Sequence, residues 1–178
     1  PKEAALKGLI FFEGFRNEIL EVAQKRYKRI SYNPLFSNLL RSEHIPLNVF
    51  GPMILNPNKT CTLFKALLSI EIESIERIGI EFAGTFTADR YLKDKTSFDT
   101  YILYRTSNGD LGGIGIEVKY TEEGYALGKK EGDDLADPKH PYNFVTKSCG
   151  YFQRPDLESV SGNDIRQIWR NHILGATM

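Results

Sequence analysis

Apolar residues recur at helical spacing through residues 3–29. This pattern predicts one long helix, or two helices broken near Gly14, and the cationic run at 25–29 suits a helix C-terminus. Residues 31–56 are rich in Pro and Asn, and three X-Pro steps predict only short helical or irregular pieces there. A further helix is expected over about 59–70. Its buried side chains are expected to be those of Leu63, Leu67 and Leu68.

Alternation of apolar and polar positions predicts a first strand over 74–82 and a hairpin over 98–106 and 110–121. The polar stretch that follows, 122–141, predicts a mobile loop around a weak helix at 122–131.

A short helix is expected over 142–149 and a final helix over about 164–174. The final helix is expected to place Ile165, Ile168, Trp169, His172 and Ile173 inward or near the sheet. Strands in the middle of the chain with helices on both sides indicate an α/β fold, with an α+β mixed sheet and helices on its faces.

Composition limits the possible classes of protein. A chain of 178 residues with 41% hydrophobic and 26% charged residues suits one soluble domain. Lys plus Arg balance Asp plus Glu at 23 each, so affinity for a polyanion must come from local patches. Cys61 and Cys149 lack metal-ligand spacing, which indicates reduced thiols of a cytoplasmic protein. No phosphate loop, Ser-His or Cys-His arrangement, membrane span or secretory signal is visible.

The register of the hairpin decides whether two of its acids share a face, because side chains alternate along a strand. With a two-residue turn at 108–109, Asp99 opposes Val118 and points away from Glu117. With a three-residue loop at 107–109 and Gly109 left-handed, Asp99 opposes Glu117. A bulge at 112–113 would give the same shift.

The three-residue loop is favoured because it also gives the hairpin one apolar face. That face would carry Phe98, Ile102 and Tyr104 beside Ile114, Ile116 and Val118. The opposite face would carry Gly113 and Gly115 next to the acids, which predicts open space in front of the carboxylates.

Two carboxylates on one face can hold a hard cation such as Mg²⁺, which takes oxygen ligands. Lys119 lies on the same strand face as Glu117 and could orient a water for attack on a phosphodiester. The alternative is a solvated polar face with an ion pair across the strands, worth about 0.2 to 1 kcal/mol.

Asp99 followed by Glu117-Val118-Lys119 on the next strand resembles the D...E-x-K core of the PD-(D/E)XK nuclease superfamily, although Phe98 stands where that superfamily has proline. Further segments resemble a poorly characterised bacterial branch of it, from about residue 9 to the end: 44–52, 96–99, 115–122 and 167–174. The resemblance implies a restriction-endonuclease-like core with a central antiparallel hairpin flanked by helices. It implies a single nuclease-like domain over 1–178, and it leaves open a truncation at the C-terminus.

The resemblance also implies a divalent-metal-dependent nuclease that hydrolyses phosphodiester bonds, first of all in DNA, for defence or DNA processing. Asp99 and Glu117 would bind Mg²⁺ or Mn²⁺ with the main-chain carbonyl of Val118, and Lys119 would activate water. The alternative is a catalytically silent nucleic-acid-binding or protein-interaction module on the same fold. The intact triad favours the enzyme, whereas the lack of a strong basic patch favours the module. Whether the protein forms a homodimer is left open.

Other polar residues are candidates for supporting roles. Glu18 is an additional candidate metal ligand, because some superfamily members use an acid of the first helix; Glu21 and Glu81 rank below it. Each of these acids could instead be an ordinary surface residue. The candidate contacts to nucleic acid are Lys25, Arg26, Arg90, Lys93, Lys95, Gln167 and Arg170. The alternative for the basic residues is helix capping and solubility, and Gln167 and Arg170 could instead brace the active site.

Overall fold

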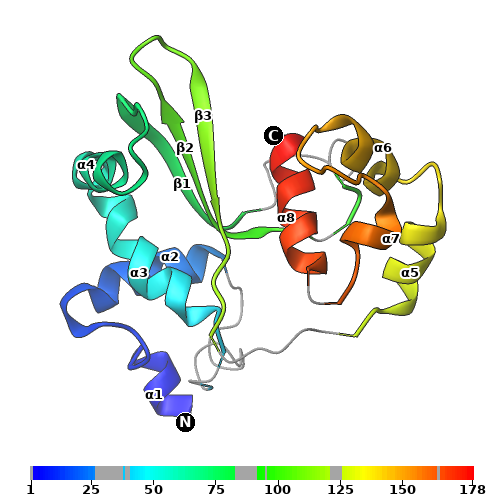
Figure 1. Ribbon diagram of the computed structural model, residues 1–178. Helices are drawn as coiled ribbons and strands as arrows, with labels where there is room; N and C mark the ends of the chain where they lie inside the picture. The colour runs from blue at the N-terminus through cyan, green and yellow to red at the C-terminus, as the bar shows by residue number, and fades with distance from the viewer. Residues whose placement is uncertain are drawn as a thin grey trace. The chain divides into compact units, whose positions relative to one another are not determined.

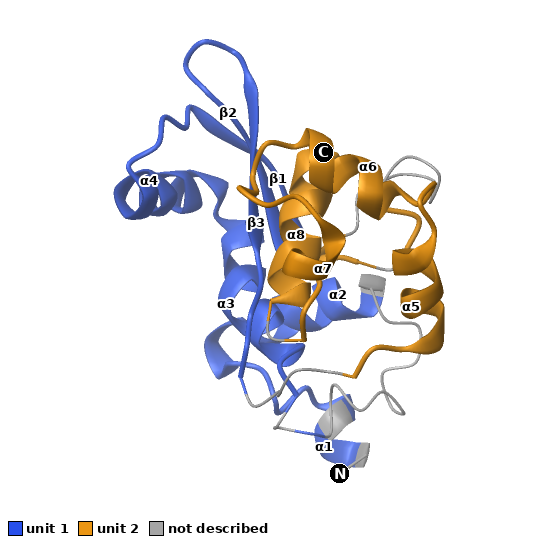
Figure 2. Ribbon diagram, turned by 45° about the vertical axis from the view of Figure 1, so that its right-hand side comes forward, with its two compact units in different colours: residues 1–80, 99–122 blue, residues 81–98, 123–178 orange. Residues whose placement is uncertain are grey.

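The computed structural model describes residues 2–26, 38, 41–82, 92–94, 96–120, 126–163 and 165–178. The chain divides into two compact units, Pro1–Ile80 with Asp99–Glu122 and Glu81–Phe98 with Glu123–Met178 (Figures 1 and 2). The first unit holds α1 to α4 and most of the sheet, and the second holds α5 to α8. The expectation of a single domain over 1–178 stays a prediction.

The N-terminal segment is broken into α1 (Lys2–Leu6), the 3-10 helix η1 (Glu13–Phe15) and α2 (Arg16–Arg26). A broken helix was one of the two expected forms, but the break lies at 7–12 and Gly14 falls inside η1. The break includes Gly8, whose φ of +62° is a conformation that side chains disfavour. A Cβ at Gly8 would also lie 2.8 Å from the side chain of Leu20. Glycine is therefore required where the chain turns back onto α2.

Helix α3 (His44–Leu55) corrects the expectation of only short pieces within 31–56; residues 27–37 and 39–40 lie outside the described part. Pro46 sits in the first turn, where a missing N–H costs no helical hydrogen bond, and Pro52 lies inside the helix. Burial of Leu47 and Phe50 offsets the bond lost at Pro52, because tertiary packing supplies most of a helix's stability.

Helix α4 (Pro57–Leu68) forms near the predicted place but buries a different face. Thr60, Cys61 and Phe64 are buried, and the latter two belong to the core cluster that includes Ile102 of the sheet. The prediction that Leu63, Leu67 and Leu68 are buried is wrong, since they are 40%, 65% and 46% exposed. The buried set (Cys61 and Phe64) and the exposed leucines both recur at helical spacing. Only the position of the sheet decides which of the two sets is buried.

The described part of the sheet has three antiparallel strands in the order β1 (Ser74–Phe82), β2 (Phe98–Arg105), β3 (Leu111–Ile116). Thr100 pairs with Ile116 and Arg105 with Leu111. The Thr106 N–H donates to the Asp110 carbonyl at 2.9 Å, and Gly109 has φ +88°. The three-residue loop at 107–109 and its register are therefore confirmed.

Strand β3 ends at Ile116, five residues before the expected end at 121. In the observed register the N–H of Val118 would continue the ladder by donating to the carbonyl of Phe98. It donates instead to the Asp99 carboxylate, Oδ2, at 2.6 Å. A side chain thus takes the place of the strand pairing, and Glu117 to Lys119 follow the strand rather than extend it.

The second unit consists of α5 (Lys129–Ala136), α6 (Pro141–Ser148), α7 (Leu157–Val160) and α8 (Arg166–Ala176) in its described part. Helix α6 confirms the helix expected over 142–149. The weak helix expected at 122–131 is misplaced: 121–125 lie outside the described part and α5 begins at 129. Ion pairs rather than apolar spacing mark α5, which is why periodicity did not locate it.

Helix α8 buries Trp169 and Ile173 as expected, together with Arg166 and Leu174. Ile165, Ile168 and His172 are exposed, so the expectation that they point inward is wrong. The residues at 166, 169 and 173 form one stripe of the helix, and those at 165, 168 and 172 form the stripe beside it. Among the described residues no helix is long and apolar enough to cross a membrane.

Candidate metal and phosphodiester site

The hairpin brings the predicted acids to one face. The observed pairing, continued by one residue from Thr100 and Ile116, sets Asp99 opposite Glu117. In a ladder that continued this far the pair would take a non-hydrogen-bonded position, where facing side chains approach most closely. The carboxylate of Asp99 is held by the Val118 N–H at 2.6 Å, so the main chain of the central residue of E-x-K lies beside it.

Lys119 reaches back to Glu117, with Nζ 2.9 Å from Oε1. The Glu117 side chain is 22% exposed and that of Lys119 is 52% exposed. An ion pair this accessible is worth about 0 to 1 kcal/mol, so stability alone gives little reason for the pair. The arrangement leaves the ammonium group at the surface, where water and a ligand can reach it.

The other face of the hairpin is apolar, as the predicted register requires. Ile102 is fully buried, and Ile114, Ile116 and Val118 pack against its cluster. Val118 therefore directs its side chain to the core while its main chain borders Asp99. Packing of Ile114, Ile116 and Val118 against the core thus holds this segment in place, and the two acids lie on its opposite face.

The expectation of open space in front of the carboxylates is wrong at Gly113. A Cβ there would lie 2.0 Å from the hydroxyl oxygen of Tyr101 and 2.6 Å from Cζ of its ring. Tyr101 shares the strand face of Asp99 and folds across the glycine. Glycine is needed here for an aromatic side chain of the protein, and Tyr101 is a polar neighbour of the site that the sequence pattern did not single out.

The donor set was tested against the needs of a divalent cation. No group of three or more His, Cys, Asp and Glu side chains in the described residues is arranged to hold a metal ion. Asp99, Glu117 and the Val118 carbonyl are oxygen donors of the kind Mg²⁺ accepts, and Mg²⁺ commonly binds through one or two carboxylates while keeping several waters. The residue types thus suit such an ion, and the roles of Asp99, Glu117 and Val118 as its ligands stay predictions.

Further acids do not complete a larger cluster. Glu18 and Glu21 are exposed on α2, and Glu81 is half-buried near the end of β1. Because no group of three is found among the described residues, Glu18 is not brought together with Asp99 and Glu117. Its role as a metal ligand stays a prediction.

The candidate nucleic-acid contacts have different outcomes. Arg90 and Lys95 lie outside the described residues, and the side chains of Lys25 and Arg26 at the end of α2 do too. Lys93 is exposed, and Gln167 is half-buried on α8. Their roles in binding stay predictions.

Arg170 lies in a polar network that the sequence did not reveal. Its guanidinium pairs with Asp94 at 3.0 Å and with Glu131 at 3.1 Å, and its Nε donates to the Thr96 hydroxyl at 2.9 Å. The side chains of Arg170, Asp94 and Glu131 are 16%, 9% and 15% exposed. These partners all lie within the second unit, and the roles of Arg170 as a nucleic-acid contact or as a brace of the active site stay predictions.

Electrostatics of this network follow from burial and hydrogen bonding. Burial acts to raise the pKa of Asp94, but hydrogen bonds from Thr96 and Tyr142 and the charge of Arg170 outweigh it and lower the pKa. Burial and the hydrogen bond to Asp94 raise the pKa of Tyr142 well above its ordinary value. The network thus keeps Asp94 ionised and Tyr142 protonated.

The fold is that of a mixed α/β protein with Asp99 on β2 and Glu117-Val118-Lys119 directly after β3. A family model described as the PD-(D/E)XK nuclease superfamily matches residues 5–178, and the chain belongs to this superfamily. Its members are usually nucleases and generally use divalent metal ions. Comparisons with curated proteins and with solved structures found no match.

Proposed function

We propose that this protein is a Mg²⁺- or Mn²⁺-dependent nuclease that hydrolyses phosphodiester bonds in DNA, with Asp99, Glu117 and Lys119 as its catalytic residues. The observation that carries the proposal is the hairpin register, which pairs Thr100 with Ile116 and, when it is extended by one residue, puts Asp99 opposite Glu117. Membership of the nuclease superfamily supports it. A cytoplasmic location belongs to the same proposal.

In this proposal Asp99 and Glu117 hold the cation together with the Val118 carbonyl. A bound divalent cation supplies a Lewis acid for the phosphoryl oxygen and lowers the pKa of a bound water. The hydrogen bond from the Val118 N–H fixes Asp99 before a ligand arrives, which reduces the reorganisation needed on binding. In this way the main-chain N–H of Val118, the central residue of E-x-K, positions the Asp99 carboxylate in advance.

Lys119 acts on the nucleophile rather than on the cation. Its side chain is 52% exposed, and its Nζ lies 2.9 Å from Oε1 of Glu117. It can therefore turn toward a water at the phosphate, where it orients the attacking oxygen and stabilises the charge that develops on the phosphoryl group. Glu117 holds the lysine in place until then.

The test is cleavage of supercoiled plasmid DNA by the wild type and by Glu117→Ala, with Mg²⁺, with Mn²⁺ and with a chelator. We expect cleavage by the wild type that the chelator and the substitution each abolish, since each removes the cation. A parallel reaction on single-stranded RNA of the same sequence identifies the substrate class. Binding of DNA without cleavage under every metal condition would favour the catalytically silent module instead.

A further inference from the structure

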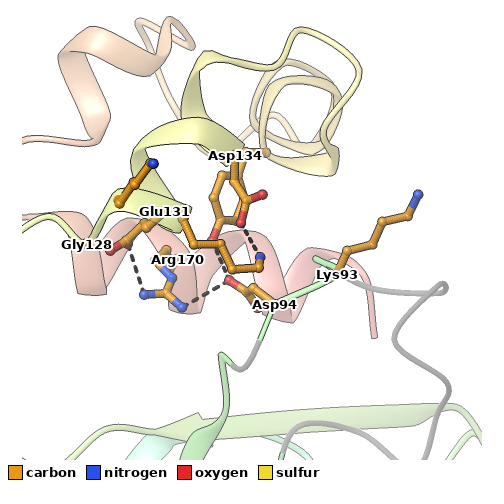
Figure 3. A pocket seen from close by; sticks show the side chains of 9 residues that line it. Lys93, Asp94, Gly128, Glu131, Asp134 and Arg170 are labelled. Carbon is orange, nitrogen blue, oxygen red and sulfur yellow. Dashed lines mark hydrogen bonds and ion pairs between the residues drawn. The ribbon is translucent and has the colours of Figure 1, made fainter.

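The second unit contains a hollow of about 640 Å³ that the proposed chemistry does not use. Its lining comes from the segment before β2, the N-terminal part of α5, and single residues of α6 and α8 (Figure 3). Pockets for small ligands commonly enclose about 300 to 1,000 Å³. The residues that line it are Lys93, Asp94, Gly128, Lys129, Lys130, Glu131, Asp134, Tyr142 and Arg170.

The floor of the hollow is a nearly buried set of groups with defined partners. Arg170 lies between Glu131 and Asp94, and dashed lines in Figure 3 mark both ion pairs. Tyr142, 1% exposed, donates its hydroxyl to Asp94. The floor therefore presents carboxylate oxygens in a rigid frame, and these accept hydrogen bonds from hydroxyl or amino groups of a ligand.

The rim has the opposite charge. Lys93, Lys129 and Lys130 are all exposed there, and Lys130 pairs with Asp134 at 2.6 Å. No ion pair found within the described residues involves Lys93 or Lys129. The rim thus has ammonium groups available to an anion.

The N-terminus of α5 lies at the same rim. Gly128 is its N-cap, no side chain caps the first turn, and Gly128, Lys129 and Lys130 all line the hollow. A helix N-terminus favours negative charge, and its N–H groups bind phosphate in many proteins. The helix end and the lysines of the rim both favour an anionic ligand group.

We infer that this hollow binds a nucleoside monophosphate unit, with the phosphate against Lys93, Lys129 and the start of α5. The sugar hydroxyls and base amino groups would face the carboxylates of the floor. The reverse orientation is disfavoured, because a phosphate in the floor would meet Asp94 and Glu131. The ligand is either a free nucleotide or the terminal nucleotide of a nucleic-acid strand.

The inference goes beyond the proposed nuclease function, because binding here requires neither the metal nor the hairpin acids. It also joins two candidates from separate parts of the sequence, Lys93 and Arg170, in one cavity. Arg170 positions the floor, whereas Lys93 touches the phosphate. Lys129 and Lys130 were not among the predicted contacts.

The experiment is calorimetric titration of the full chain, in chelator, with the four deoxynucleoside 5′-monophosphates, the matching nucleosides and inorganic phosphate. We expect at least one nucleotide to bind more tightly than its nucleoside and than phosphate. The double variant Lys93→Gln with Lys129→Gln should bind about tenfold more weakly, since charge-assisted hydrogen bonds to the phosphate are lost. The matched control is Lys139→Gln with Lys147→Gln, two exposed lysines of the same unit outside the hollow.

Equal affinity of nucleotide and nucleoside, or equal losses in the two double variants, would overturn the inference. If inorganic phosphate binds as tightly as every nucleotide, the claim that the hollow also binds the sugar and the base is overturned. Competition by an oligonucleotide with a 5′-phosphate, compared with the same oligonucleotide without it, identifies a strand terminus as the source; its failure to compete identifies the free nucleotide. Glu117→Ala should bind the nucleotide normally, so failure of the nuclease proposal would not affect this result.

Discussion

Replacement of Arg170 by Met should destabilise the second unit strongly. The substitution removes one guanidinium that pairs with two carboxylates, at 3.0 Å and 3.1 Å, and these carboxylates stay 9% and 15% exposed. Breaking a buried pair in this way costs about 3 to 5 kcal/mol, because the remaining charge is left without compensation. Asp94 keeps hydrogen bonds from Thr96 and Tyr142, so we expect a loss near the lower end, about 3 kcal/mol.

The assay is urea denaturation followed by tryptophan emission. Trp169 is the sole tryptophan, it is 1% exposed, and it precedes Arg170 on α8, so its emission reports on the unit that holds the network. The control is Arg154→Met, an exposed arginine of the same unit, which should change the free energy of unfolding by less than about 0.5 kcal/mol. A loss below about 1 kcal/mol for Arg170→Met would refute the network as a source of stability.

The pH dependence of the same variant gives a second readout. A lowered carboxyl pKa contributes stability at pH values above the ordinary 3.8, and this contribution disappears as the pH falls through the folded-state pKa. Arg170→Met removes part of what lowers the pKa of Asp94. The difference in unfolding free energy between wild type and variant should therefore narrow as the pH falls below 3.8. A constant difference would show that Asp94 is not the group left uncompensated.

Three further predictions address packing and protonation. Phe64→Ala should cost about 3 to 5 kcal/mol of unfolding free energy while Leu67→Ala costs under about 0.5, and similar losses in denaturant titrations would contradict the observed face of α4. Gly113→Ala should cost about 1 to 3 kcal/mol by forcing the Tyr101 ring aside, and most of that cost should vanish in a Tyr101→Ala background. Burial lowers the pKa of His140 below its ordinary 6.5, so stability measured against pH should fall as the pH drops below 6.5, and His140→Gln should flatten this slope.

The hairpin could be predicted from the sequence because its determinants are local. Gly109 favours the three-residue loop because it adopts a positive φ. The register is the one that puts Ile102, Ile114 and Ile116 on the same apolar face of the hairpin. The end of β3 could not be predicted, since it depends on a side chain, Asp99, taking the N–H of Val118. Local pattern therefore predicted the register of the hairpin but not the course of the chain after Ile116.

The helix faces show a second limit. On α4 the stripe with Leu63 and Leu67 is as apolar as the stripe with Cys61 and Phe64, and only the location of the sheet selects one. The polar network is a third limit, because Arg170 and Asp94 are 76 positions apart and each looks like an ordinary surface charge. Such long-range ion pairs leave no periodic signal, so the hollow beside them could not be predicted either.

The most direct test of the nuclease proposal is the single-turnover rate of DNA cleavage across a Mg²⁺ series for wild type, Glu117→Gln and Asp110→Asn. Each substitution removes one charge from an acid of the same hairpin, but Asp110 adjoins the loop at the far end from Asp99. We predict that Glu117→Gln loses cleavage at every Mg²⁺ concentration, by about a hundredfold or more, while Asp110→Asn keeps the wild-type rate. Equal rates for Glu117→Gln and Asp110→Asn would contradict the assignment of the catalytic site.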